Sequence, residues 1–331
     1  MSNSVNRFLM LEEEPGKGST PGKERQLEKL RRDCGGEFLI ALEDSKTIEI
    51  VLNADGILWQ ERLGEGMRRI GEMKPSRAEA IIRTVASMLG VIVRWDRPLL
   101  EGEFPLDGSR FAAQLPPVVS APTFALRKKA SAVFTLDDYV ESGIMTPHQQ
   151  QVLKEGVINR KNILVIGGTG SGKTTLVNGL IDIVTTFCEH ERILLIEDTG
   201  EIQCTAHNSV KFHTTLDVTM TQLLRTTLRM RPDRILVGEV RGPEALDLLM
   251  AWNTGHEGGI ATLHANNARA GLDRLKTLIT MNRERPEGIE SLIAEAVHLI
   301  VHIAKTERNR VVKEVLAVEG FQNGDYITKP V

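Results

Sequence analysis

The sequence predicts an α/β protein, with a mainly parallel sheet covered by helices on both faces and a smaller N-terminal α+β domain. The length of 331 residues is about twice that of a common single domain. After Phe134, short apolar runs alternate with amphipathic segments, which is typical of parallel sheets because their strands need crossover connections. We therefore expect a disordered tail over 1–25, the α+β domain over 26–127, a linker over 128–137 and the parallel-sheet domain over 138–331.

The N-terminal domain shows strand and turn signals after a start that is rich in Glu, Gly, Pro, Lys and Ser. An Asn-Ala-Asp-Gly turn joins the predicted strands Thr47–Leu52 and Ile57–Arg62 into a hairpin. Ser76 and Glu79 have the spacing of a capping box, which predicts the start of an amphipathic helix. A second hairpin is expected around Asp107–Gly108.

The C-terminal domain contains five predicted strands in alternation with helices. The strands are Asn162–Ile166, Arg192–Glu197, Ile235–Gly238, Gly259–Leu263 and His298–Ile303. The helices are expected near 173–186, 219–230, 243–252, 267–281 and 287–297. An antiparallel strand over Val311–Val318 is expected to extend the sheet.

A complete G-x-x-x-x-G-K-T sequence follows the first of these strands and precedes the first helix, which is the context of a phosphate-binding P-loop. Glycines let backbone N–H groups converge on phosphate oxygens, and the helix start adds positive potential. Lys173 supplies a charge to the β- and γ-phosphates, and the Thr174 hydroxyl can ligate Mg²⁺. The predicted cofactors are ATP and Mg²⁺, with Thr174 as the metal ligand. The predicted nucleotide-binding residues are Gly167, Gly168, Thr169, Gly170, Ser171, Gly172, Lys173, Thr174 and Thr175.

Two acidic side chains are predicted at the rim where the parallel strands end. Glu239 ends an apolar strand, as in a Walker B motif, although Gly238 stands where an Asp is usual. A carboxylate there can orient and deprotonate the attacking water. Glu197 opens a second acidic cluster and could hold that water or bridge Mg²⁺ through water. The alternative is that the acids of this cluster cap the loop that follows.

His264 follows the strand Gly259–Leu263, so it should lie on the same rim. There it could sense the γ-phosphate by hydrogen bonding. The alternative is an imidazole that is satisfied by the backbone.

Composition excludes several classes of protein. The formal net charge is −3 and aromatic residues make up 4%, so direct nucleic-acid binding through a basic or base-stacking surface is not indicated. Three scattered cysteines form no C-x-x-C pair, which argues against a disulfide framework or a zinc ribbon. No apolar run approaches the ~18 residues of a membrane span. We expect a cytoplasmic protein.

The order of P-loop, acidic cluster, Gly-Glu Walker B and His motif resembles the type II/IV secretion traffic ATPase superfamily. The segments 228–242, 254–258 and 262–266 are similar to those of type IV secretion ATPases. In the first domain, 107–111 and 124–129 resemble the conjugal-transfer branch. Gly238 is the family's own form of Walker B.

This resemblance implies a RecA-like P-loop ATPase domain in a Mg²⁺-dependent ring ATPase, a homohexamer. It implies a place at the cytoplasmic face of the inner membrane, among membrane and cytoplasmic components of a type IV secretion or mating-pair apparatus. It also implies that Arg110 and Arg127 of the first domain reach the phosphates and act in catalysis with Lys173, Glu239, His264 and Glu197. The alternative within the family is a tight-adherence or other type IV pilus assembly ATPase. A small-molecule kinase, a DNA motor and a scaffold that binds ATP without hydrolysing it are the alternatives outside it.

Overall fold

The computed structural model describes residues 21–331, apart from 64, 130–132, 216, 283–285 and 307–308. The chain divides into two compact units, Met1–Lys128 (unit 1) and Lys129–Val331 (unit 2). Residues 1–20 of the expected tail lie outside the described residues. The prediction is wrong for 21–25, which form the first turn and a half of a helix that starts at Pro21 and buries Leu30 completely.

Unit 1 is an α+β unit built on an antiparallel sheet. Within its described residues the sheet has six strands in the order β3-β2-β1-β6-β5-β4. Its elements are α1 (Pro21–Cys34), α2 (Gly36–Glu43), β1 (Thr47–Leu52), β2 (Ile57–Arg62), β3 (Gly66–Glu72), α3 (Pro75–Met88), β4 (Leu99–Glu103), β5 (Arg110–Gln114) and β6 (Thr123–Arg127). Both predicted hairpins are present, as the antiparallel pairs β1–β2 and β4–β5.

One face of this sheet makes the core of unit 1. Phe38 of α2 packs against Phe104 and Phe124, with ring centroids 5.7 and 5.9 Å apart. Phe111 of β5 continues the cluster. The predicted capping box is wrong, because α3 begins one residue before Ser76, at Pro75, and its N-terminal flanking residue Lys74 makes no side-chain cap. Proline suits the first helical position because its φ is already helical and its missing N–H is not needed there.

Unit 2 contains the predicted mainly parallel sheet. Within the described part of the unit the strand order is β14-β13-β12-β7-β11-β10-β8-β9. Neighbours from β12 to β9 are parallel, and β13 and β14 add to the edge in antiparallel orientation. The elements are α4 (Leu136–Glu141), α5 (Pro147–Ile158), β7 (Ile163–Ile166), α6 (Lys173–Phe187), β8 (Ile193–Glu197), β9 (Ser209–His213), α7 (Met220–Thr227), β10 (Arg234–Val237), α8 (Glu244–Trp252), β11 (Ile260–Leu263), α9 (Ala268–Thr280), α10 (Ile289–Ala296), β12 (Leu299–Lys305), β13 (Arg310–Gln322) and β14 (Asp325–Pro330).

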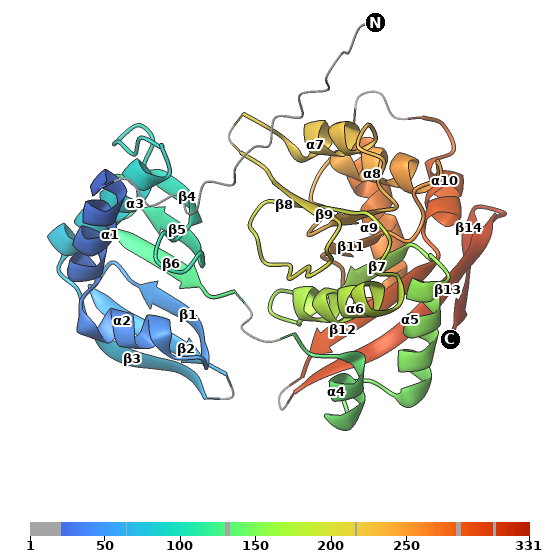
Figure 1. Ribbon diagram of the computed structural model, residues 1–331, viewed down its shortest axis with the longest axis horizontal. Coiled ribbons are helices and arrows are strands. Elements are labelled where there is room, and N and C mark those ends of the chain that lie inside the picture. Colours follow the sequence, from blue (N-terminus) through green and yellow to red (C-terminus); the bar gives the residue numbers. More distant parts are fainter. Residues whose placement is uncertain (1–20, 64, 130–132, 216, 283–285, 307–308) are drawn as a thin grey trace, which may run out of the picture. The chain divides into compact units, whose positions relative to one another are not determined.

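Helices cover both faces of the sheet, and each face has its own core (Figure 1). Ile163 and Val165 of β7 face the cluster that includes α4, α5 and α6, whereas Leu164 and Ile166 face the cluster of α7 to α10. All four residues are buried, which explains why this strand reads as an unbroken apolar run.

The five predicted strands and five predicted helices of unit 2 are present, with ends shifted by a few residues. The elements α4, α5, β9 and β14 were not predicted. The expected linker ends too late, because Thr135 caps α4 through a capping box with Asp138 and Leu136 is buried in the core. In β9 every residue is at least partly exposed, so this edge strand lacks the apolar run of the central strands.

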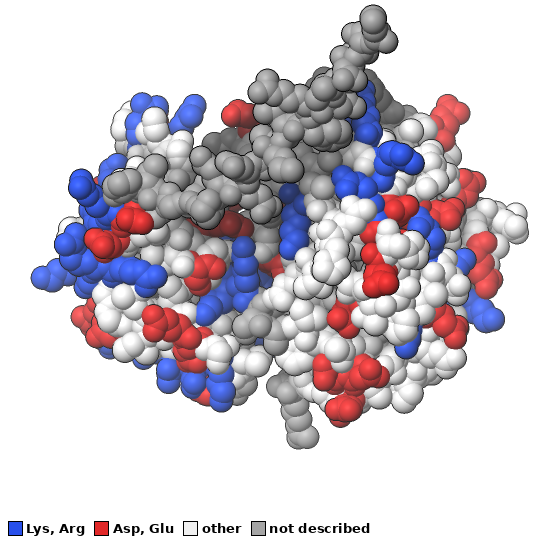
Figure 2. Space-filling view, viewed as in Figure 1, with Lys and Arg blue, Asp and Glu red and all other residues white. Residues whose placement is uncertain are grey.

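The surface carries mixed charge. In Figure 2, Lys and Arg side chains are interspersed with Asp and Glu on the visible face of each unit, in keeping with the net charge of −3. Among the described residues, none of the helices combines the length and the apolar character needed to cross a bilayer.

Candidate nucleotide site

The loop between β7 and α6 has the backbone that a phosphate site needs. Gly170 and Gly172 have φ of 68° and 98°, which side chains rarely tolerate. A Cβ on Gly167 would collide with the carbonyl oxygen of Ile303 and lie 2.5 Å from Ser171 Oγ. A Cβ on Gly168 or Gly170 would meet open space. The loop is therefore tightly packed on one side and open on the other, at the N-terminus of a helix of 15 residues.

Lys173 is the first residue of α6, directly after this loop. Its side chain is mostly buried, and Nζ donates to the carbonyl oxygens of Gly167 and Gly168 at 3.0 and 3.1 Å. The ring of His264 is 3.4 Å from Nζ. The ammonium group is thus held at the loop by two carbonyl oxygens, at the position from which a lysine can contact a bound phosphate.

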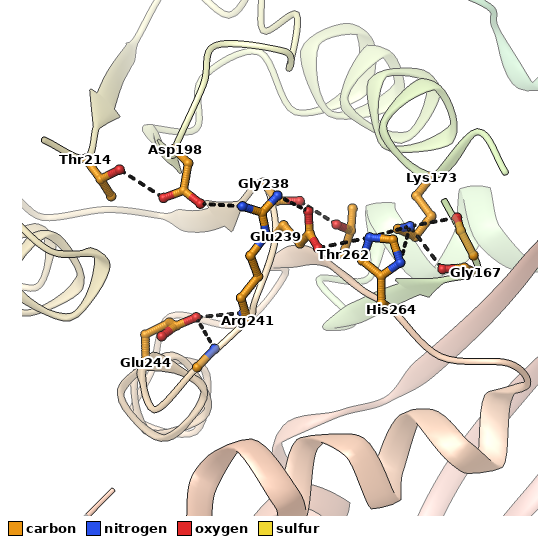
Figure 3. Close-up of polar contacts among 12 residues, drawn as sticks. Gly167, Lys173, Asp198, Thr214, Gly238, Glu239, Arg241, Glu244, Thr262 and His264 are labelled. Carbon is orange, nitrogen blue, oxygen red and sulfur yellow. Dashed lines mark hydrogen bonds and ion pairs between the residues drawn. The ribbon is translucent and has the colours of Figure 1, made fainter. Parts of the chain in front are cut away.

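A continuous line of polar contacts runs from Lys173 across the ends of β11, β10 and β8 (Figure 3). His264 Nε2 lies 3.1 Å from Glu239 Oε1. Arg241 donates to Glu239 Oε2 at 2.6 Å and to Asp198 Oδ2 at 3.2 Å. The Glu244 carboxylate accepts from the backbone N–H of Arg241 at 2.7 Å, which fixes that segment. The predicted residues Lys173, His264 and Glu239 are therefore brought together.

Glu239 is held in its ionised form. Burial by itself would raise the pKa of this carboxyl, but the hydrogen bond and charge of Arg241, with smaller contributions from His264 and Lys173, lower it. An ionised carboxylate beside a phosphate site can accept a proton from water.

Glu197 explains the glycine in the Walker B strand. A Cβ on Gly238 would lie 2.9 Å from Glu197 Cγ and 3.3 Å from its Oε1. The side chain of Glu197 thus occupies the space that an Asp at 238 would need. A side chain at 238 would displace that of Glu197, so the acidic group at this place comes from the neighbouring strand β8 instead.

The carboxyl of Glu197 has two different oxygens. Oε1 accepts from the backbone N–H groups of Ile202 and Glu201 at 2.9 and 3.1 Å. Oε2 is buried and has no hydrogen-bond partner within the described structure. Burial raises the pKa of Glu197 to about 7, although the two N–H groups oppose the rise. Glu197 therefore holds the following loop through Oε1, as the alternative interpretation expected. Its second oxygen, Oε2, can bind a proton or a water molecule.

The segment 256–266, which contains β11 and forms the His motif, has two ends with different roles. His264 follows the C-terminal end of β11, beside Lys173, whereas Glu257 and Gly258 precede its N-terminal end, roughly 13 Å away along four residues. At that distant end the carbonyl oxygens of Gly258 and Glu257 accept hydrogen bonds from Arg234 and Arg160. This half of the motif is structural.

Arg110 and Arg127 lie in unit 1, where they are direct cross-strand partners on β5 and β6. Glu103 faces Arg110 from β4, and Glu49 faces Arg127 from β1. All four stand on the sheet face opposite Phe111 and the core. Their part at the phosphates stays a prediction.

Arg241 was missed as a site residue, although it follows Glu239 by two positions. In an extended segment, residues two apart point to the same side. That spacing, with an acid in the loop after the neighbouring strand, is the signal that could have identified it.

The oxygens at this rim suit Mg²⁺ with a nucleotide. Among the described residues no three His, Cys, Asp or Glu side chains form a metal-binding group. Magnesium is commonly bound by one or two protein oxygens together with phosphates. Thr174, on the first turn of α6, offers such an oxygen. The open side of the loop leaves room for the phosphates.

Known proteins resemble this chain over most of its length. The family model described as type II/IV secretion system protein matches residues 98–322. The probable conjugal transfer protein TrbB of Sinorhizobium fredii is 46% identical over 302 residues, 91% of this chain and 92% of the relative. The conjugal transfer protein TrbB of Rhizobium radiobacter is 45% identical over 305 residues, 92% and 94% of the two chains.

Among solved structures, the ATPase DotB of Legionella pneumophila has a TM-score of 0.59 and 21% identity, covering 92% of this chain and 83% of that one. At that identity the likeness concerns the fold.

Proposed function

The chain belongs to the type II/IV secretion system protein family, and from that premise we propose that it is an ATPase that powers type IV secretion or conjugative DNA transfer. Unit 2 is, in this proposal, a RecA-like P-loop ATPase domain that converts ATP and water to ADP and phosphate with Mg²⁺. The parallel sheet with the P-loop at its carboxyl rim supports this assignment.

The observation that carries the proposal is the contact line Lys173–His264–Glu239. In this line the imidazole of His264 lies between the phosphate-binding ammonium group of Lys173 and the ionised carboxylate of Glu239. A protein that only held ATP would not need an ionised carboxylate at this place. A kinase would need an acceptor pocket, for which nothing in the sequence gives a signal.

Each side chain has a distinct task in the proposed hydrolysis. The loop N–H groups and Lys173 bind the phosphates. Glu239 accepts the proton of the attacking water, and Arg241 holds that carboxylate in place. The Thr174 hydroxyl would ligate Mg²⁺, which neutralises charge on the phosphates. His264, between Lys173 and Glu239, is placed to contact the γ-phosphate.

The relatives' names favour conjugation over pilus assembly. One TrbB protein is named a conjugal transfer protein and the other a probable conjugal transfer protein, and each matches more than nine-tenths of this chain. We therefore propose a homohexamer, peripheral at the cytoplasmic face of the inner membrane, that works with other components of a mating-pair apparatus. Sedimentation of the full chain with and without a non-hydrolysable ATP analogue tests the ring. A monomer under both conditions at micromolar protein contradicts it.

The function is tested by two variants that fail in different ways. Lys173→Ala should abolish Mg²⁺-dependent hydrolysis and weaken nucleotide binding, because it removes a charge-assisted contact to phosphate. Glu239→Gln should retain binding while hydrolysis falls by about 10²–10⁴-fold, as expected for loss of a general base. Lys211→Ala, on the edge strand β9, is the matched control and should behave as the unmodified protein. Undiminished turnover by Lys173→Ala would refute the ATPase assignment.

A further inference from the structure

The hairpin of β12 and β13 flanks the phosphate loop. Strand β12 is parallel to β7, with His302 opposite Ile166, the last residue of β7. The residues after His302 therefore run on beside the loop rather than beside the strand. Ile303 shows this directly, since its carbonyl oxygen fills the space beside Gly167.

Arg310 begins the returning strand and its side chain lies against the last glycine of the loop. A Cβ built on Gly172 would be 3.0 Å from Arg310 Cδ and 3.4 Å from Arg310 Nε. Gly172 is the N-cap of α6, directly before Lys173, the first residue of that helix. The side chain of Arg310 is half-buried. Its aliphatic part thus packs on the phosphate loop itself, and the guanidinium follows directly after Nε.

The strand that carries Arg310 is held firmly. Val312, two residues on, is buried, and its N–H donates to the carbonyl oxygen of Ile144 at 2.8 Å. Its own carbonyl oxygen accepts from Gln149 Nε2 at 3.3 Å. These contacts tie β13 to the start of α5, so the arginine is presented from a rigid support.

Two positive charges face each other at this end of the hairpin. Lys305 and Arg310 are direct cross-strand partners. Like charges in this arrangement are destabilising. Among the residues that the structure describes, no carboxylate forms an ion pair with either side chain. A bound anion between the hairpin and the loop would relieve this repulsion.

We propose that Arg310 binds the phosphate chain of the nucleotide as an arginine of the same unit as the P-loop. This inference rests on the proposed function and adds a residue to it that neither the motifs nor the resemblance assigned. A guanidinium is suited to the task because its planar fork can donate two hydrogen bonds to phosphate oxygens. It differs from the proposed role of Arg110 and Arg127, which belong to unit 1.

The test compares ligands with and without a base. Dissociation constants of the full chain for MgADP and for magnesium tripolyphosphate are measured by calorimetry. Arg310→Met keeps the aliphatic stem and should weaken both ligands by about tenfold, the loss expected for one charge-assisted hydrogen bond. Arg310→Lys should lose less. Lys313→Met, an exposed change on the same strand, is the control and should bind as the unmodified chain does.

Three results would contradict a phosphate contact by Arg310. Equal binding by Arg310→Met and Lys313→Met, with an unchanged melting temperature, overturns the proposal while the ATPase assignment stands. Weaker MgADP binding with unchanged tripolyphosphate binding also overturns it, because the contact would then be to the base or ribose. If the unmodified chain binds neither ligand, the proposed function falls, and this inference falls with it.

Discussion

The buried carboxyl group of Glu197 has two structural roles. Its side chain fills the space beside Gly238, and one oxygen holds the loop at Glu201 and Ile202. The other oxygen has no partner within the described structure. Ionising such a group in the folded protein is unfavourable, since burial removes water from the charge. The carboxyl is therefore poised to exchange a proton near neutral pH.

The raised pKa of Glu197 predicts that the free energy of unfolding depends on pH. The pKa of Glu197 is raised from 4.5 to about 7 in the folded protein. Between these two pH values the folded state holds a proton on Glu197 that the unfolded state has lost. The stabilisation that this proton gives the folded state is fully present below pH 4.5 and is lost as pH rises through 7. Glu197→Gln removes the titration. Relative to the unmodified protein, the variant should gain up to about 3 kcal/mol of unfolding free energy between pH 5 and pH 8.

The measurement is urea unfolding followed by tryptophan fluorescence. The chain has three tryptophans, and replacing Trp59 and Trp95 by Phe leaves Trp252, which is fully buried in unit 2, as the reporter. Glu319→Gln on β13 is the exposed control. Parallel pH curves for Glu197→Gln and the unmodified background would show that Glu197 has no raised pKa.

At the scale of elements, the two ends of the parallel strands carry separate polar systems. The carboxyl ends carry the candidate nucleotide site, and the amino ends carry a buried ion network. Glu191 accepts from the fully buried Arg234, which starts β10, and from Arg160 at 2.6 Å. Arg234 also donates to the Gly258 carbonyl at 3.1 Å. The network thereby ties β8, β10 and the loop before β11 together.

Breaking this network should destabilise unit 2 strongly. Glu191→Gln leaves the Arg234 guanidinium buried without its anion, which should lower the unfolding free energy by about 3–5 kcal/mol. Arg160 is 34% exposed, so Arg160→Met should have a smaller effect. Replacing Glu191 and Arg234 together by Met should recover much of the loss, because no charge then remains buried.

The unfolding free energies of these variants are measured with the same fluorescence assay on Trp252. A loss for Glu191→Gln no larger than that for Arg160→Met would mean that the buried pair does not hold the strand ends together.

At the scale of the whole molecule, we propose that ATP hydrolysis depends on arginines of unit 1. Arg110 and Arg127 form a cross-strand pair on the sheet face away from the core, with Glu103 and Glu49 beside them. Arginine that stabilises charge in the transition state matters more for turnover than for binding.

Arg127→Ala should therefore lower ATP hydrolysis by about 10²-fold or more while the affinity for ADP changes little. Arg127→Lys should rescue the rate in part, because a point charge does not reproduce the guanidinium fork. The control is Arg69→Ala on β3, an arginine paired with Glu72. Hydrolysis by Arg127→Ala at the rate of Arg69→Ala would leave Arg127 as a surface residue of unit 1.

The sequence by itself determined the elements with strong local signals. The central strands of unit 2 are unbroken apolar runs, and the P-loop combines glycine spacing with a strand before it and a helix after it. Such patterns depend on nearby residues alone, so β7, α6, Lys173 and Glu239 were all predicted. Strand β9 was missed because an exposed edge strand needs no apolar run. The start of α3 was misassigned because Ser76 and Glu79 matched a capping pattern that Pro75 made unnecessary.

Only the tertiary structure decided what the remaining residues do. That Gly238 leaves room for Glu197, that Arg241 joins Glu239 to Asp198, and that Arg310 packs on Gly172 are contacts between separate strands and loops. Residues 138 positions apart, such as Gly172 and Arg310, become neighbours only when β12 pairs with β7 and turns back as β13. No local pattern encodes such a contact, because it depends on the order in which strands assemble into the sheet.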